Sequence, residues 1–379
     1  MDPEADGAVF ACIEKTTEAG PTETRAWCLQ ERMLSARLVV FGPEQLVFSC
    51  VTGLITEQSG HCPQTLLHGP NAPLLSYKGL GAKAFDPEIR SLVLTSWYYA
   101  VSNYSTRQMS NPLDVFAAIS GVARRAEQFR LGQYLAGLWS DDLLQGLLWL
   151  PKSSRMMWQV GASKRPTIAT AYGDQVVTRA PSWSWAALQG PVFYGSADGE
   201  YFFSDKSRHR ISPVHADPER WTLNERVGTS QLLMPECKLE FRAVLKQVRC
   251  SAVPAGIHLS RARCYLKNFG TDRILLLTPT ADMYPGKIVA AGILDLEERH
   301  TGNLYCMQVV DTTWHKDQKQ AEPFRVAMDV DRERFPLMVD GLLLTEQASS
   351  QGYVRVGSFK VLNHEYFDDR SGERVIELV

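Results

Sequence analysis

Several features that would indicate a particular function are missing from this sequence of 379 residues. No apolar run approaches the roughly 20 residues of a transmembrane helix, so we expect no membrane span. The acidic start, residues 1–6, has no apolar segment of the kind that secretory signals carry, so we expect no such signal. The net charge of -2 and the isoelectric point near 6.5 show no excess of basic residues, so we expect no nucleic-acid partner.

The cysteines offer neither a metal site nor a disulfide framework. The eight cysteines form no C-x-x-C pair, and no histidine lies at zinc-finger spacing from a pair of them. His61 and Cys62 are the only adjacent His/Cys pair, and two ligands cannot complete a four-ligand zinc site. Eight cysteines without a secretory signal are typical of free thiols in a reducing compartment, so we predict a cytoplasmic protein without a metal.

The signatures of common enzyme mechanisms are also absent. The sequence contains no G-x-S-x-G elbow, no P-loop, no G-x-G-x-x-G after a strand and no H-E-x-x-H. The single G-x-G, residues 79–81, falls within an expected loop. We therefore expect no cofactor, so any catalysis would depend on the side chains of this chain alone.

The composition is that of a globular protein, with 45% hydrophobic and 22% charged residues. The length exceeds the size at which one hydrophobic core keeps growing, which favours two domains or one domain with a large appendage. We predict a loose leader over residues 1–21, a helical part over residues 22–150 and a β-rich part over residues 151–379.

The helical part is predicted to begin with a short helix and a hairpin. Thr22 or Thr24 would cap a helix that carries residues 25–34. Two β-type runs, residues 37–41 and 46–51, follow with a Gly-Pro turn signal between them. The next stretch is rich in Gly, Pro, His and Asn, and loops of this length are often lids. It spans residues 56–85 and includes two candidate ligand contacts, His68 and Tyr77.

Three further helices are predicted from their starting residues. Asp86-Pro87-Glu88 and Asn111-Pro112 each combine a capping residue with a proline in the first turn, and an apolar stripe follows each of them. Ser140-Asp141-Asp142 precedes a group of leucines, and carboxylates in a first turn suit the helix dipole.

The β-rich part is predicted from short apolar runs separated by turn residues. Residues 180–186 alternate small residues with tryptophan, which predicts a strand with Trp183 and Trp185 on one face. No amphipathic helix alternates with the later runs, which favours an antiparallel sheet. The fold class is therefore α+β, with an N-terminal helical part and a β-hairpin, followed by a mostly antiparallel β sandwich or barrel. The expected strands are 238–248, 274–278, 287–295, 304–310, 337–345, 353–361 and 375–379.

Several motifs resemble a known family. Residues 25–37 read R-A-W-C-L-Q-E-R-M-L-S-A-R, and residues 45–50 read Q-L-V-F-S-C. This segment resembles the end of the fungal heterokaryon-incompatibility (HET) domain. Residues 179–186, R-A-P-S-W-S-W-A, are the most specific later motif of the resemblance. The resemblance extends over roughly residues 22–379. Its shorter matches lie at residues 97, 104–107, 137–139, 147–149, 341–344 and 353–359.

The sequence also departs from the family pattern. HET proteins usually carry a large N-terminal part that is thought to be related to TIR signalling domains, with S-Y-x-W-G and W-I-D-x-x-C-I-x-Q motifs. Those motifs do not occur here, so we expect this part to be missing and do not expect a nucleotide-cleaving or TIR-like role. Ala26 replaces the usual glycine, which is a minor change within a helix.

Two functions of different classes fit the sequence. The first is a HET-derived, cofactor-free enzyme of fungal secondary metabolism, a cyclase or Diels–Alderase-like pericyclase that binds a hydrophobic polyketide or terpenoid intermediate. Positioning the reacting groups can contribute up to about 7–11 kcal/mol when two molecules are brought together, and less for an intramolecular closure. The alternative is a non-enzymatic interaction protein of fungal self/non-self recognition, which would expose a sizeable apolar patch.

The enzyme hypothesis names its own site residues. The expected catalytic residues are Glu31, Tyr104 and Arg107, and a donor such as Arg107 would stabilise developing charge by about 2–4 kcal/mol. An aromatic pocket would bind the substrate. Its expected lining is Trp27, Trp97, Trp183 and Trp185. The simpler interpretation is that Glu31 pairs with an arginine, Arg32 or Arg107, and that the tryptophans form an interdomain core. The sequence predicts no oligomeric state.

Overall fold

The computed structural model describes only part of the chain. The described residues are 22, 24–41, 45–50, 53–57, 60–63, 87–151, 164–170, 173–194, 209–216, 238–252, 274–280, 287–296, 303–311, 339–347 and 351–379. The expected leader and the two expected loop contacts, His68 and Tyr77, lie outside these residues.

The N-terminal region consists of one helix and a small sheet. Helix α1 (Ala26–Leu34) buries Ala26, Leu29 and Met33, whose spacing of three and four places them on one face. The predicted threonine caps are wrong. Arg25 occupies the N-cap without a side-chain bond, since a guanidinium has no acceptor for a backbone N–H, and the N–H of Ala26 donates to Gln108 O at 2.9 Å.

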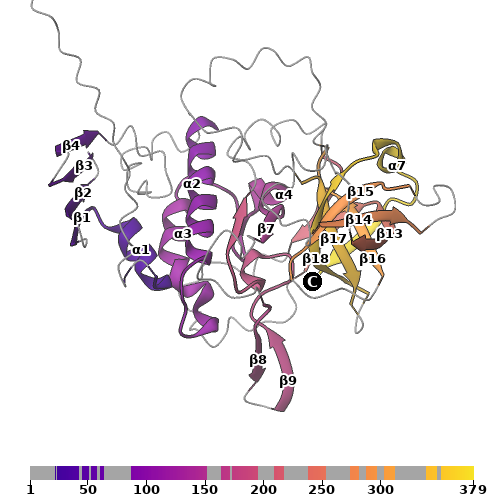
Figure 1. Ribbon diagram of the computed structural model, residues 1–379, viewed down its shortest axis with the longest axis horizontal. Helices are drawn as coiled ribbons and strands as arrows, with labels where there is room; N and C mark the ends of the chain where they lie inside the picture. The colour runs from indigo at the N-terminus through magenta and orange to yellow at the C-terminus, as the bar shows by residue number, and fades with distance from the viewer. Residues whose placement is uncertain are drawn as a thin grey trace, which may run out of the picture.

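The predicted hairpin is confirmed and is extended by two strands into an antiparallel sheet of order β1-β2-β3-β4. The last strand begins inside the stretch that we expected to be loop. Figure 1 shows this sheet at one edge of the molecule, beyond α1 and away from the barrel. The strands are β1 (Arg37–Phe41), β2 (Leu46–Cys50), β3 (Gly53–Thr56) and β4 (Gly60–Pro63).

The predicted helices after residue 86 are present, although the last is short. Helix α2 (Pro87–Ser105) is long, and Asn111 caps the η4 turn (Pro112–Val115), which leads through η5 (Ala117–Ile119) into α3 (Ser120–Glu127). The third expected helix is a 3₁₀ turn followed by a single α-helical turn. These two elements are η6 (Ser140–Asp142) and α4 (Leu143–Gly146).

Three short antiparallel strand pairs lie between α3 and the barrel strands in the sequence. The pairs are β5 (Tyr134–Leu135) with β6 (Leu138–Trp139), β7 (Trp149–Pro151) with β10 (Val192–Tyr194), and β8 (Thr167–Thr170) with β9 (Gly173–Thr178). None of the helices in the described part of the chain is both long and apolar enough to cross a membrane.

The predicted strand over residues 180–186 is wrong. This segment is a loop that ends in a 3₁₀ turn, η8 (Trp185–Ala187). Side chains satisfy its backbone groups in place of a neighbouring strand. The Arg179 guanidinium donates to Ala186 O at 2.7 Å and to Leu188 O at 2.8 Å, and Ser184 Oγ accepts from the N–H of Ala186 at 3.0 Å.

The C-terminal region is a closed, antiparallel six-stranded barrel. A barrel is one of the two β architectures that we expected from the sequence. The barrel closes because β13, β14, β15, β18, β17 and β16 pair in a ring. Three strands, β19, β12 and β11, extend the sheet from β18, and α7 lies on the barrel (Figure 1). The bounds are β11 (Ser212–Ala216), β12 (Leu239–Ala243), β13 (Leu245–Ala252), β14 (Ile274–Pro279), β15 (Ala290–Leu294), β16 (Leu304–Gln308), β17 (Gly341–Glu346), β18 (Tyr353–Val361), α7 (His364–Asp368) and β19 (Arg374–Leu378).

Candidate functional site

Three of the four tryptophans expected to bind substrate lie in the protein core. Trp97 and Trp183 are 0% exposed and Trp185 is 2% exposed. The indole N–H groups of Trp97 and Trp185 both donate to Gly137 O, at 3.3 Å and 3.0 Å. Gly137 permits this arrangement because its φ of 92° is in the left-handed region and a Cβ there would lie 2.8 Å from Trp185 Cε2.

Other aromatic rings pack around these indoles in edge-to-face geometry. The ring centroid of Trp97 lies 5.7 Å from that of Trp139 and 5.8 Å from that of Tyr134. Trp185 contacts Tyr104 at 5.8 Å in the same manner. Aromatic pairs in this geometry stabilise a core beyond the effect of burial alone.

This packing bears directly on the expected aromatic pocket. Because water reaches none of the surface of Trp97 or Trp183, neither indole borders a space that would hold a ligand in this conformation. Trp27 is 40% exposed on α1 and is separate from this core. The structure therefore brings Trp97 and Trp185 together at Gly137 within one hydrophobic core and places Trp27 elsewhere.

The three expected catalytic residues have different environments. The Tyr104 hydroxyl donates to Val115 O at 2.8 Å, and burial raises the pKa of this phenol. Arg107 Nε donates to Asn103 Oδ1 at 2.8 Å, and its Nη1 donates to Arg25 O at 3.3 Å, so it attaches the start of α1 to the end of α2. Glu31 is exposed on α1. Arg107 and Tyr104 therefore have structural contacts that account for their positions.

Arg355 forms a buried charged site that sequence analysis missed. Its guanidinium carbon lies 3.4 Å from the centroid of the Trp149 ring, and the side chain is fully buried. It donates to Leu147 O at 2.5 Å and Trp149 O at 2.6 Å. It also forms an ion pair with Asp295, whose other partner is Arg165 at 3.3 Å. Burial lowers the pKa of Arg355, and the Asp295 carboxylate opposes that effect.

This Arg355 cluster is a structural link between barrel strand β18 and the segment before β7. The Arg355 guanidinium donates to Leu147 O, Trp149 O, Asp295 and Ser358 Oγ, so it is bonded to protein groups on several sides. The only signal in the sequence was an arginine inside the apolar run of residues 353–361, and a sequence pattern does not distinguish a buried arginine from an edge-strand arginine.

Asp142 is a second charged group that sequence analysis assigned only to helix capping. Its carboxylate makes no capping bond and instead accepts a hydrogen bond from the Tyr98 hydroxyl. Burial raises the pKa of Asp142 to about 7, although Tyr98 and Arg90 oppose the shift. Tyr194 packs against Tyr98 in a tilted arrangement, with ring centroids 4.1 Å apart and an interplanar angle of 35°. Such a carboxyl group exchanges a proton near neutral pH, which is a property of catalytic and of pH-sensing residues alike.

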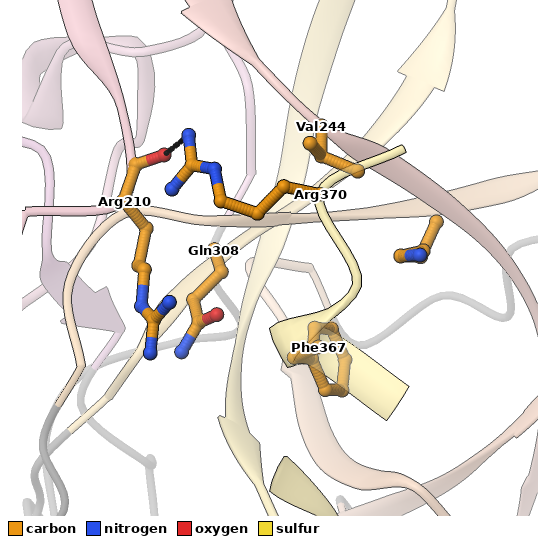
Figure 2. Close-up of a pocket in the computed structure, with 6 residues that line it drawn as sticks. Arg210, Val244, Gln308, Phe367 and Arg370 are labelled. Atoms are coloured by element: carbon orange, nitrogen blue, oxygen red, sulfur yellow. Dashed lines mark hydrogen bonds between the residues drawn. The ribbon is translucent and has the colours of Figure 1, made fainter. Parts of the chain in front are cut away.

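A small hollow lies between the barrel and α7. Figure 2 shows its lining, with the Arg370 guanidinium donating to Arg210 O at 3.1 Å. Its cavity volume is about 10 Å³, which is room for about one water molecule and far below the usual range for a metabolite site. The cations of the lining are paired with acids, Arg210 with Asp311 at 2.6 Å and Lys246 with Asp369 at 2.8 Å. The lining is Arg210, Val244, Lys246, Gln308, Phe367 and Arg370.

The most unusual surface lies on the N-terminal sheet. Phe41 is 83% exposed, Val39 is 47% exposed and Ile55 is 41% exposed. The strand register places Val39 opposite Phe48, Phe48 opposite Ile55, and Phe41 opposite Leu46. Side chains of directly paired residues point to the same side of a sheet. We call this surface the apolar sheet face; it consists of Val39, Phe41, Leu46, Phe48 and Ile55.

None of these five residues belongs to the hydrophobic clusters of the described core. Of the eight large hydrophobic residues that are exposed in the described part of the chain, four lie on α1, β1 and β3. An apolar surface of this kind is the usual mark of an interaction site.

No protein-family model, curated protein or solved structure matches the chain. The resemblance to the HET family therefore stays a prediction from the sequence. Within the described residues, no group of three or more His, Cys, Asp or Glu side chains is placed to hold a metal ion.

Proposed function

We propose that this chain is a non-enzymatic interaction protein of the HET type, the second of the two functions considered from the sequence. It binds another protein chain through the apolar sheet face. The observation that carries the proposal is the exposure of Phe41, Val39 and Ile55 on one side of a sheet that lies outside the core. Burying one large apolar side chain contributes about 1.5–3 kcal/mol, so a few such residues suffice for association.

The packing of the tryptophans supports interaction over cyclisation. A cyclase of the expected kind needs a cavity between aromatic walls, and here Trp97 packs against Trp139 and Trp185 packs against Tyr104. A substrate could enter only by displacing buried indoles. Deleting such a side chain from a core typically costs about 3–5 kcal/mol, so displacing one would offset much of the binding energy of a small hydrophobic molecule.

Site-specific photo-crosslinking in cells tests this proposal. Phe41 is replaced by the photoreactive residue benzoylphenylalanine, and the matched control carries it at Val375, which is 49% exposed on β19. The expected result is a protein adduct from position 41 that is absent from position 375. Ile55→Asp should abolish the adduct because Ile55 shares the apolar sheet face, whereas Val214→Asp, at a site 50% exposed on β11, should retain it.

Two results would contradict the proposal. One is an equal yield of adducts at positions 41 and 375, which would indicate collisions without a preferred surface. The other is an adduct at position 41 that survives Ile55→Asp, which would mean that the apolar sheet face does not bind the partner.

A further inference from the structure

Strand β1 forms one edge of the N-terminal sheet, and among the described residues it pairs only with β2. Its sequence, R-L-V-V-F, has no proline, glycine or acidic residue, and its only charge is at its first position. A β-strand edge that is exposed and apolar is a template for pairing with another chain.

The edge of the large sheet provides a contrast within the same molecule. Strand β11 is the corresponding edge there, and it carries Pro213 and an irregular register between Pro213 and His215. Proline and bulges are the devices by which proteins prevent unwanted edge pairing. The protected edge of β11 and the unprotected edge of β1 indicate that β1 is available for a partner strand.

We propose that β1 pairs antiparallel with β1 of a second copy of this chain, around a two-fold axis at Val39. The inference rests on the proposed function and specifies the partner. The register centred on Val39 pairs all five residues of both strands. Arg37 then faces the partner's Phe41, Leu38 faces the partner's Val40, and Val39 faces the partner's Val39.

The strand is complementary to itself in this register. The Arg37 side chain lies opposite an aromatic ring, which is a favourable cation–π pairing, and no two like charges meet. The residue that faces its own copy is a valine, which packs well across an antiparallel pair. Every second residue of an edge strand directs its N–H and C=O groups away from the neighbouring strand. A two-fold axis can pass through a hydrogen-bonded or a non-hydrogen-bonded residue pair, so the axis at Val39 is possible whichever residues of β1 point outward.

The consequence is a continuous eight-stranded sheet across the two copies. Both apolar sheet faces then lie on the same side, because paired residues point to the same side of a sheet. The exposed Phe41 gains a neighbour across the axis. The interface is isologous, so the assembly closes as a dimer and leaves no free β1 edge for further growth.

The test is light scattering coupled to size-exclusion chromatography on the full chain. The wild type is expected to be dimeric at micromolar concentration. Val39→Lys and Val39→Glu should each raise the dissociation constant by about tenfold or more, because two like charges then meet at the axis. Equal amounts of the two variants should form a heterodimer, because opposite charges then meet at the axis. The matched control is Val214→Lys on β11, which should leave the dimer unchanged.

Circular dichroism first establishes that each variant is folded; if one is not, Phe41→Lys replaces it, since Phe41 also lies on β1 and the lysine would meet the like charge of the partner's Arg37. A monomeric wild type at every concentration, a dimer that tolerates the single charge, or a mixture of folded Val39 variants that stays monomeric would each overturn the inference. A different result would overturn the proposed function. A monomeric wild type that still gives a specific adduct to a different protein at position 41 overturns the dimer alone, whereas loss of any specific adduct overturns the proposed function.

Discussion

Gly137 shows at the scale of one residue why this core is closed. A single carbonyl accepts the indole N–H groups of Trp97 and Trp185, which lie 88 positions apart in the sequence. The positive φ of Gly137 directs that carbonyl between the two rings, and a side chain at this position would collide with one of them. The indole donors are thereby satisfied inside the protein and are unavailable to a substrate.

Gly137→Ala should therefore lower the free energy of unfolding by about 3 kcal/mol or more, measured by urea denaturation. The matched control is Gly372→Ala, where φ is 81° and no atom lies within 4 Å of the added Cβ. That control carries only the backbone strain, about 1–2 kcal/mol. Equal losses in the two variants would show that the contact with Trp185 is not tight.

Asp142 predicts a pH dependence of stability with a definite sign. Below about pH 4 the carboxyl is protonated in both the folded and the unfolded chain. Between about pH 4 and about pH 7 it ionises only in the unfolded chain, because its folded pKa is raised from 3.8 to about 7. The group therefore lowers stability as the pH rises through this window, and the loss is complete above about pH 7.

Asp142→Asn should remove this contribution while its amide oxygen still accepts the Tyr98 hydroxyl. We expect the variant to gain on the order of 2 kcal/mol relative to the wild type between acid and neutral pH, since Asp142 is partly buried. Denaturant titrations at several pH values measure the difference, with Asp141→Asn as the neighbouring control. A constant difference between wild type and variant across this window would contradict the assignment.

At the scale of elements, the presence of strands and helices was predicted better than their ends or contacts; the expected strand 238–248, for example, is two strands, β12 and β13. Strand β18 was predicted with its observed bounds, since alternation and flanking turn residues mark a strand locally. The segment 180–186 showed the same alternation and is a loop, because Arg179 and Ser184 satisfy its backbone through side chains. A local pattern of small and aromatic residues cannot reveal that a distant or neighbouring side chain replaces a partner strand.

Arg355 also shows this limit, since its partners come from elements far apart in the sequence. Arg355→Met should lower the free energy of unfolding by about 3–5 kcal/mol, because it breaks the connection from β18 to Leu147 and Trp149 and leaves buried Asp295 with one partner fewer. Thermal or denaturant unfolding measures the effect, and exposed Arg249→Met is the control, with an expected change below about 0.5 kcal/mol. Similar losses in both variants would contradict a structural role for the Arg355 cluster.

For the whole molecule, the fold class was predictable and the candidate site was not. Hydrophobic patterning predicted the α+β division and an antiparallel sandwich or barrel, because each strand signal is local, and the strand pairing of the structure shows that it is a barrel. The interaction hypothesis predicted an exposed apolar patch, but it named no residue of the apolar sheet face. Alternation identified β1 and β2, but the exposure of Phe41 depends on where the sheet lies relative to the core, which no local pattern encodes.

The closed core makes a prediction about ligands. Trp27 is exposed on α1, and Trp158, Trp221 and Trp314 lie outside the described residues, so the test uses a variant in which these four are replaced by phenylalanine. Titration of this variant with polyenes or quinone methides should leave tryptophan emission without a saturable change, because Trp97, Trp183 and Trp185 have almost no accessible surface. Saturable quenching in this variant would contradict the closed core.

Native mass spectrometry of the intact protein, purified gently from its host, tests the central claim most directly. The account predicts added mass in units of whole protein chains, including multiples of 42.4 kDa, and loss of that mass in Phe41→Asp. Added mass of a small metabolite that survives Phe41→Asp and disappears in Trp183→Phe would contradict the account and support the enzyme hypothesis.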